Sequence, residues 1–227
     1  MLQGVGRNLL GFCPIEDYPF LEGPSMNIAI IVGSHRKDSQ SSRVGAYIVK
    51  DLVRIDPLLH VDTIDLAGNP LPMWDESIWQ GDSELASVWK PYRDKMRKAD
   101  GFVIISPEWA GMVPPGLKNL LLFAGPKEVG HKPVLIVAVS ASRGGSYPVN
   151  ELRTSGYKNS RLLYIPEHVL VQDVADVLAG ETPTSDRDAW LRRRIEFADR
   201  ILLEYAKALA PIRSSGLTEH ADFPYGM

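Results

Sequence analysis

The stretch Asn27–Ser42, which reads NIAIIVGSHRKDSQSS, decides the fold class of this chain. Its first six residues are almost all apolar, which is typical of a strand buried on both faces of a sheet. A polar, turn-rich segment follows, and Ser41 or Ser42 can then cap a helix that runs to about Ile55. A buried strand that leads through a loop into an amphipathic helix is the repeating unit of parallel α/β sheets.

The same alternation of strands and helices continues along the rest of the chain. Apolar runs predict further strands at 61–66, 101–106, 133–140 and 168–172. Helical periodicity predicts helices at 83–98, 116–124, 149–158 and 184–209. We therefore predict an α/β fold, a doubly wound five-stranded parallel sheet with strand order 2-1-3-4-5 and helices on both of its faces.

The 227 residues divide into three predicted regions. Residues 1–25 show neither strand nor helix periodicity and are rich in proline and glycine, so we expect an irregular N-terminal arm. Residues 26–210 carry the α/β pattern and form one domain, which is an ordinary size for a single core. Residues 211–227 are polar and are expected to form an irregular C-terminal tail.

Composition excludes several classes of function. The net charge is −3 with no basic bias, so nucleic acid is not an expected partner. The single cysteine, Cys13, excludes an intrachain disulfide and suits a reducing compartment. No apolar run approaches the roughly 18 residues that span a membrane, and the N-terminus does not resemble a signal peptide. We therefore expect a soluble cytoplasmic protein with no membrane partner.

The predicted topology indicates where a ligand binds. In doubly wound sheets, ligands bind beyond the carboxyl ends of the strands, where the strand order reverses. That point lies between the first and third strands. Three loops begin at this edge, and we name them loop one (33–42), loop two (106–116) and loop three (140–146). They are also the loops with the most unusual composition.

Loop one is suited to bind a phosphate group. It precedes a helix N-terminus, where free amides and the helix dipole attract anions. Arg36 can pair with the charge, and four hydroxyls can donate hydrogen bonds: Ser34, Ser39, Ser41 and Ser42. The loop lacks both the Walker and the Gly-x-Gly-x-x-Gly patterns, which favours a terminal phosphate, as on FMN, over a pyrophosphate. The alternative is a capped turn with solvent-exposed serines.

Loops two and three are suited to surround a flat ring. Loop two begins Pro107-Glu108-Trp109-Ala110-Gly111, and its aromatic side chain and glycine can form a wall. Loop three contains Ser142, Gly144 and Gly145, and the glycines allow the backbone to approach a ring closely. The alternatives are a connector in which Trp109 fills a core gap, and an ordinary tight turn.

Other kinds of site have little support in the sequence. The five histidines show no metal-ligand spacing, so no metal is expected: His35, His60, His131, His168 and His220. The sequence lacks the Gly-x-Ser-x-Gly elbow that is typical of catalysis by a Ser/His/Asp triad. Trp74 and Trp79 lie in a long irregular stretch, 67–82, where they either pack or cover a substrate.

Taken together, the three loops resemble those of the NADPH-dependent FMN reductase family of flavodoxin-like proteins. That family's signature is Gly-Ser-x-Arg-x-x-Ser, then Pro-Glu-Tyr-Asn-Gly, then Leu-Lys-Asn. This chain has 33–39 (GSHRKDS), 107–111 (PEWAG), 117–119 (LKN), and the matching 143–145 (RGG). The resemblance covers roughly 27–205. It departs from the family at Trp109, Ala110 and Ser41, which replace Tyr, Asn and Asn.

The resemblance implies a flavodoxin-like sheet with FMN at its carboxyl edge. The phosphate would bind to Ser34, Arg36, Ser39, Ser41 and Ser42. The ring would lie beside Pro107, Glu108, Trp109, Ala110 and Gly111, with loop three (Ser142, Gly144 and Gly145) approaching its pyrimidine side. The family would use NADPH to reduce a small-molecule acceptor such as a quinone, azo dye, metal oxyanion or flavin. The cofactor carries this chemistry, so no catalytic side chain is expected.

Two further expectations depend on the same resemblance. Relatives commonly form homodimers or homotetramers, and 117–124 together with 67–82 are the predicted interface elements. The alternatives in function are a flavin-binding electron carrier or redox sensor without NAD(P)H turnover, and a flavin-free scaffold.

Overall fold

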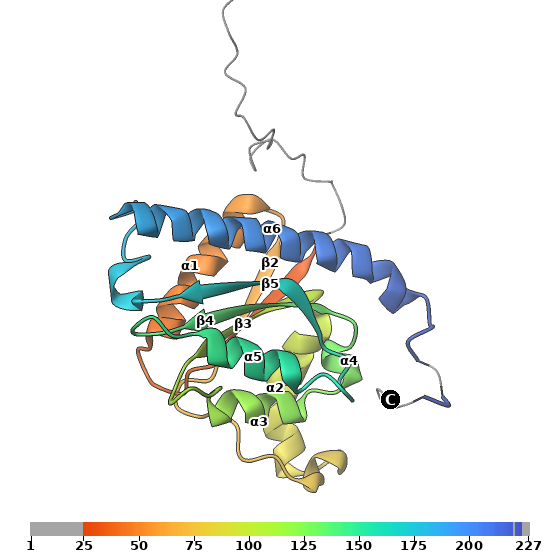
Figure 1. Ribbon diagram of the computed structural model, residues 1–227. Helices are drawn as coiled ribbons and strands as arrows, with labels where there is room; N and C mark the ends of the chain where they lie inside the picture. Colours follow the sequence, from red (N-terminus) through yellow and green to blue (C-terminus); the bar gives the residue numbers. More distant parts are fainter. Residues whose placement is uncertain (1–24, 220, 224–227) are drawn as a thin grey trace, which may run out of the picture.

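The computed structural model describes residues 25–219 and 221–223 and contains a five-stranded sheet (Figure 1). The strands are β1 (Asn27–Val32), β2 (His60–Asp65), β3 (Gly101–Pro107), β4 (Pro133–Val139) and β5 (Leu163–Val171). All neighbouring strands are parallel, and their order is β2-β1-β3-β4-β5. The predicted fold class and strand order are therefore confirmed. The predicted N-terminal arm lies outside the described residues, apart from Ser25.

Helices cover both faces of the sheet. The α-helices are α1 (Gln40–Ile55), α2 (Glu84–Lys98), α3 (Pro115–Phe123), α4 (Pro126–Val129), α5 (Ser146–Thr154) and α6 (Asp186–Ser214). Two short 3-10 helices are η2 (Glu76–Trp79) and η3 (Val174–Asp176). Helices α1 and α6 lie on one face, whereas α2, α3 and α5 lie on the other (Figure 1). None of the helices in the described ranges combines the length and apolar character that a membrane span requires.

The sheet separates two hydrophobic cores. Alternate residues of β1 enter different cores: Ile28 and Ile30 pack under α1 and α6, whereas Ala29 and Ile31 pack under α2 and α3. Every residue of β3 and of β4 is buried. Strands buried on both faces need apolar side chains at every position, which is why the sequence shows continuous apolar runs here.

Three elements differ from the sequence-based expectations by more than two residues at one or both ends. Strand β5 begins at Leu163 and not near His168, because its first half is only partly buried and carries polar residues. Helix α5 occupies Ser146–Thr154 and not 149–158. Helix α6 continues through Pro211 to Ser214, so the first residues of the predicted irregular tail are helical. The last turn is anchored by Arg213, which donates to Asp100 Oδ1 at 3.0 Å.

Candidate functional site

The three predicted loops begin side by side at the carboxyl edge of the sheet. The amide of Gly33 donates to Ile105 O at 2.8 Å, which continues the β1–β3 pairing beyond the end of β1. The amide of Glu108 donates to Val139 O at 2.9 Å, and that of Ser140 donates to Val171 O at 2.9 Å. These bonds fix the start of each loop relative to the next strand. The topology therefore brings together residues that are far apart in the sequence.

Gly33 allows helix α3 to pack against the start of loop one. A Cβ at this position would lie 2.7 Å from Leu117 Cδ2 and 2.8 Å from Ile105 O. Real side chains do not tolerate such distances, so any larger residue here would push α3 away from the sheet. The glycine thus sets the spacing between loop one and the helix that follows loop two.

Ser39 caps helix α1 at its N-terminus. Its Oγ accepts a hydrogen bond from Ser42 N at 3.1 Å, and its backbone is extended. The expectation that Ser41 or Ser42 is the cap was wrong, because the helix already begins at Gln40. Ser42 Oγ lies 3.0 Å from Ser39 Oγ and donates to Asp65 Oδ2 at 3.3 Å. Of the predicted phosphate ligands, Ser39 and Ser42 therefore both have hydroxyls that contact other protein groups.

Two other residues of loop one, Arg36 and Lys37, add positive charge just before the N-terminal end of α1, and Asp38 adds one negative charge. Within the described residues, the exposed side chains of Arg36 and Lys37 make no hydrogen bond or ion pair. Helices α2 and α6 carry acidic residues in their first turns, but α1 carries none. Amides in the first helical turn have no intrahelical acceptor. Ser34 and Ser41 are buried beside this end. These donors suit an anion such as a phosphomonoester.

Loop two makes a tight turn that places Trp109 against loop one. Trp109 and Met112 exchange backbone hydrogen bonds of 3.2 and 2.9 Å, and the turn between them has left-handed backbone at Ala110 (φ 50°) and Gly111 (φ 72°). The Trp109 and His35 rings meet edge to face, with centroids 4.5 Å apart and an interplanar angle of 82°. Trp109 is only half-buried and belongs to neither core, so it does not fill a core gap.

Glu108 joins loop two to loop three. Its carboxylate accepts a hydrogen bond from the amide of Gly145, the N-cap residue of α5, whose φ is 111°. A Cβ on Gly144 would lie 2.8 Å from Glu108 Oε1 and 3.0 Å from Ser140 Oγ. The amide of Gly145, predicted to approach a ring, therefore already has a protein acceptor. Pro107 is the buried last residue of β3, and Ser142 is exposed.

The arrangement fits the group that the sequence resemblance implies. Hydroxyl, amide and guanidinium donors gather at the end of α1, as an FMN phosphate requires. Glycines in loop three and the half-buried Trp109 provide backbone and an aromatic surface at the neighbouring loops. His35 was not among the predicted site residues, yet it contacts Trp109. Its position directly after Ser34 was visible in the sequence, but its contact was not.

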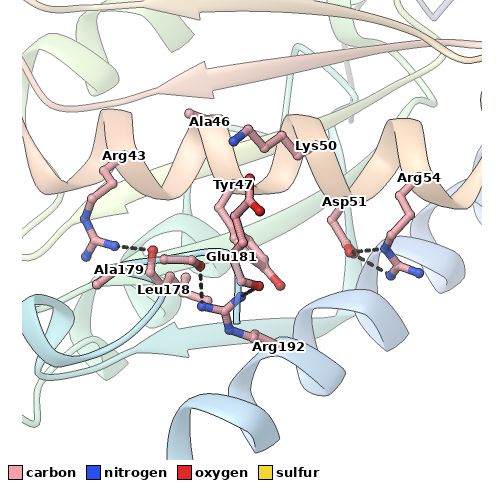
Figure 2. A pocket seen from close by; sticks show the side chains of 11 residues that line it. Arg43, Ala46, Tyr47, Lys50, Asp51, Arg54, Leu178, Ala179, Glu181 and Arg192 are labelled. Carbon is pink, nitrogen blue, oxygen red and sulfur yellow. Dashed lines mark hydrogen bonds and ion pairs between the residues drawn. The ribbon is translucent and has the colours of Figure 1, made fainter. Parts of the chain in front are cut away.

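A large cavity lies elsewhere, on the outer flank of α1 (Figure 2). It has a volume of about 580 Å³ and is lined by α1, residues 178–181 and the start of α6. Arg43 donates to Val177 O and Leu178 O at 2.9 and 2.7 Å. Arg192 donates to Glu181 O at 2.8 Å and pairs with Asp188. These arginines hold the segment after β5 in place, so the cavity is a recess of the scaffold and contains none of the predicted site residues.

Among the residues that the structure describes, no three His, Cys, Asp or Glu side chains lie close enough together to hold a metal ion.

Comparisons with known proteins find relatives of this chain. The sequence model of the family described as NADPH-dependent FMN reductase matches residues 26–176, more than half of the chain. A probable NADPH:quinone oxidoreductase 1 of Oryza sativa subsp. japonica is 30% identical over 76% of this chain and 88% of its own. A 2-hydroxy-1,4-benzoquinone reductase of Burkholderia sp. is 29% identical, over 71% of this chain and 87% of its own.

A solved structure also shares the fold. It is a flavoenzyme NAD(P)H:(acceptor) oxidoreductase from Paracoccus denitrificans, which superimposes with a TM-score of 0.60 over 81% of this chain and 97% of its own. At 18% sequence identity, this likeness supports the fold alone.

Proposed function

This chain belongs to the NADPH-dependent FMN reductase family, and from that membership we propose that it uses NADPH to reduce a quinone-class acceptor by two electrons. It is an FMN-dependent NAD(P)H oxidoreductase. The balance of the proposed reaction is quinone plus NADPH plus a proton, giving hydroquinone and NADP⁺. Bound FMN supplies the redox chemistry, since its ring accepts two electrons from a nicotinamide and releases them to a second molecule.

The observation that carries this proposal is the junction of loops one and two at the topological switch point. There His35 of loop one, which precedes the N-cap of α1, contacts the ring of Trp109, so the loop proposed to bind the anion lies against an aromatic side chain. A phosphate linked to a flat ring is the ligand whose parts match both surfaces. This support is independent of the family motif, because it depends on contacts between segments.

Each loop has its own part in the proposed site. Loop one holds the phosphate through charge-assisted and hydroxyl hydrogen bonds from Ser34, Arg36, Ser39, Ser41 and Ser42. Loop two places Pro107, Glu108, Trp109, Ala110 and Gly111 beside the ring. Loop three approaches it with Ser142, Gly144 and Gly145. Glu108 holds loops two and three together through the amide of Gly145. No side chain of this chain is required as a general acid or base.

Quinones are proposed as the acceptor class because both relatives described above are named as quinone-reducing enzymes and are covered over most of their length. The net charge of −3 does not favour nucleic acid as a partner. We also propose a cytoplasmic location, because a single cysteine in 227 residues suits a reducing compartment.

We further propose that two or more copies assemble through the face formed by α3 and α5. Met112, Leu122 and Tyr147 on this face have exposed fractions of 56%, 63% and 67%. A groove of about 220 Å³ between the two helices is lined partly by Leu121 and Leu152. The Tyr147 ring lies 3.7 Å from the place of a Cβ on Gly111, so this face borders loop two. Exposed apolar patches of this kind are typical of protein–protein contacts.

The proposed function is tested by one spectroscopic titration. The protein is loaded with FMN, made anaerobic and mixed with NADPH, and then with a benzoquinone. We expect the visible absorption of oxidised FMN to disappear with NADPH and to return with the quinone. FMN that neither NADPH nor NADH bleaches would contradict the reductase and favour an electron carrier. Bleached FMN that an azo dye reoxidises but a quinone does not would contradict the acceptor class.

A further inference from the structure

His35 has one buried ring nitrogen and one accessible ring nitrogen. Nδ1 is buried and has no hydrogen-bond partner among the described residues. Nε2 is not among these buried atoms, and no acceptor among the described residues binds it. An unpartnered buried polar atom is uncommon in native proteins and calls for a physical explanation. The two nitrogens therefore have different surroundings, which determines what the ring can offer to a ligand.

The buried nitrogen faces the N-terminus of α3. A Cβ on Gly116, in the first turn of α3, would lie 3.8 Å from His35 Nδ1. Asn69 Oδ1 would lie 3.2 Å from the same Cβ, but it accepts no hydrogen bond from the buried ring nitrogen. The first turn of α3 has neither a side-chain cap nor an acidic residue, so its positive end is not neutralised. A positive helix end attracts a nitrogen lone pair and repels an N–H group.

This surrounding selects one tautomer of the neutral imidazole. In that form one nitrogen carries the proton and the other carries a lone pair. A proton on Nδ1 would be a buried donor without an acceptor, pointing at the positive end of α3. The proton therefore belongs on Nε2, on the side of the ring away from α3. The geometry leaves His35 with one accessible hydrogen-bond donor.

One ring contact and two hydrogen bonds of the nearby backbone position His35. Trp109 meets it edge to face at 4.5 Å. The carbonyl of His35 accepts a hydrogen bond from Gly68 N at 3.0 Å, which ties loop one to the segment after β2. His35 follows Ser34 directly, and the amide of Arg36 donates a hydrogen bond to Ser34 Oγ at 3.3 Å. His35 thus belongs to loop one, which carries the proposed phosphate site, and its ring contacts Trp109 of the proposed ring site.

We propose that His35 contacts FMN and donates a hydrogen bond from Nε2 to one of its oxygen atoms. The inference rests on the proposed function, since it assigns a further binding residue to the same site. In the proposed site, the FMN phosphate lies at the end of α1 and the FMN ring lies beside Trp109. The part of FMN that joins the phosphate to the ring then lies next to the imidazole of His35. The hydroxyl and carbonyl oxygens of FMN are acceptors that match a single N–H donor.

Two matched variants separate this role from simple packing. His35→Gln keeps an N–H donor near the place of Nε2, whereas His35→Asn keeps a polar group only near the place of Nδ1. We expect the dissociation constant of FMN, measured by fluorescence titration, to rise about tenfold in His35→Asn and to stay within about threefold in His35→Gln. His60→Asn, on the exposed edge of β2, is the control and should bind FMN normally. Equal affinities for all variants, or a weaker Gln variant than Asn variant, would overturn the proposal.

A measurement on the unmodified protein covers the case in which a variant does not fold. The ¹⁵N shifts of the imidazole nitrogens are recorded by NMR before and after saturation with FMN. We expect the Nε2-protonated tautomer and a change of the His35 Nε2 shift on binding, with His60 unchanged. The Nδ1-protonated tautomer, or an unchanged Nε2 shift with FMN bound, would overturn the assignment of His35 alone. Failure of the protein to bind FMN would overturn the proposed function together with it.

Discussion

Arg36 and Ser39 serve the end of α1 in different ways. Arg36 adds a free positive charge, whereas Ser39 caps the helix with its Oγ. We predict that replacing both with alanine weakens FMN binding by about 2–4 kcal/mol, because charge-assisted hydrogen bonds are lost. Isothermal titration with FMN measures this loss. Unchanged affinity would contradict the phosphate assignment.

A matched control separates the cap from the ligand. Ser83 caps α2 in the same geometry as Ser39 caps α1, since its Oγ accepts from Ala86 N at 3.1 Å. Ser83→Ala should cost about 1 kcal/mol of stability, as Ser39→Ala does, without changing FMN affinity. Equal effects of the two cap variants on FMN binding would show that only helix stability had been measured.

Gly144 is a position where the absence of a Cβ atom determines the local structure. A methyl group there would meet the carboxylate of Glu108 at 2.8 Å and displace it from the amide of Gly145. We predict that Gly144→Ala lowers stability by about 1–3 kcal/mol and also weakens FMN binding. Urea unfolding and FMN titration test this. Gly180→Ala is the control, because nothing lies within 4 Å of its added Cβ.

At the scale of elements, helices α1 and α6 bury two carboxyl groups between them. Asp199 of α6 is fully buried, and Asp51 of α1 is nearly so. Neither oxygen of Asp199 has a donor among the described residues, so a proton between the two carboxyls is the way to satisfy them. Burial raises the pKa of Asp199 well above its usual value, and the neighbouring Asp51 and Glu196 raise it further, whereas Arg54 lowers it. Burial also raises the pKa of Asp51.

This pair predicts a pH-dependent stability. The folded protein holds the Asp199 proton at a pH where the unfolded chain, with a carboxyl pKa of about 3.9, has released it. The contribution of Asp199 to stability is therefore greatest at low pH. It falls as the pH rises toward the pKa of Asp199 in the folded protein. We predict that Asp199→Asn reduces this slope, by at most about 1.4 kcal/mol per pH unit for one proton. Urea unfolding between pH 5 and 8, roughly the range of maximal stability of proteins, measures the slope. Identical slopes would contradict the shared proton.

At the scale of the whole molecule, the proposed FMN site links the ends of three strands and three helices. A ligand that binds only the folded chain stabilises it by about 2.7 kcal/mol at a concentration of 100 times its dissociation constant. For a chain of this size we predict that FMN raises Tm by roughly 5–10 °C. Thermal unfolding followed by circular dichroism measures the shift. Riboflavin, which lacks the phosphate, should give a smaller shift, and an equal shift would contradict the phosphate site in loop one.

The proposed assembly is also a property of the whole molecule. A charge on the α3–α5 face must be desolvated when two copies meet, whereas a charge elsewhere on the surface stays in water. We predict that Leu122→Glu lowers the mass measured by light scattering to that of one chain. Leu58→Glu, at an exposed position after α1, is the control and should leave the assembly intact. A single-chain mass for the unmodified protein would contradict the assembly itself.

The sequence by itself determined the sheet, its strand order and the edge that carries the candidate site. Strands buried on both faces need unbroken apolar runs, and both β3 and β4 show them. Parallel strands joined by helices leave few possible orders, and motifs in loops one to three marked the ligand edge. The edge strand β5 began earlier than predicted, because a half-exposed strand tolerates polar residues and shows a weak pattern.

Only the tertiary structure decided how the loops meet. The contact of His35 with Trp109, the bond from Gly145 to Glu108 and the close packing of Gly33 on Leu117 all join residues distant in the sequence. Local patterns report which side of an element is buried, but not which side chain it faces. Such contacts depend on strand order, helix position and side-chain direction together. For that reason the sequence could predict a phosphate site in loop one, whereas it could not predict the contact between His35 and Trp109.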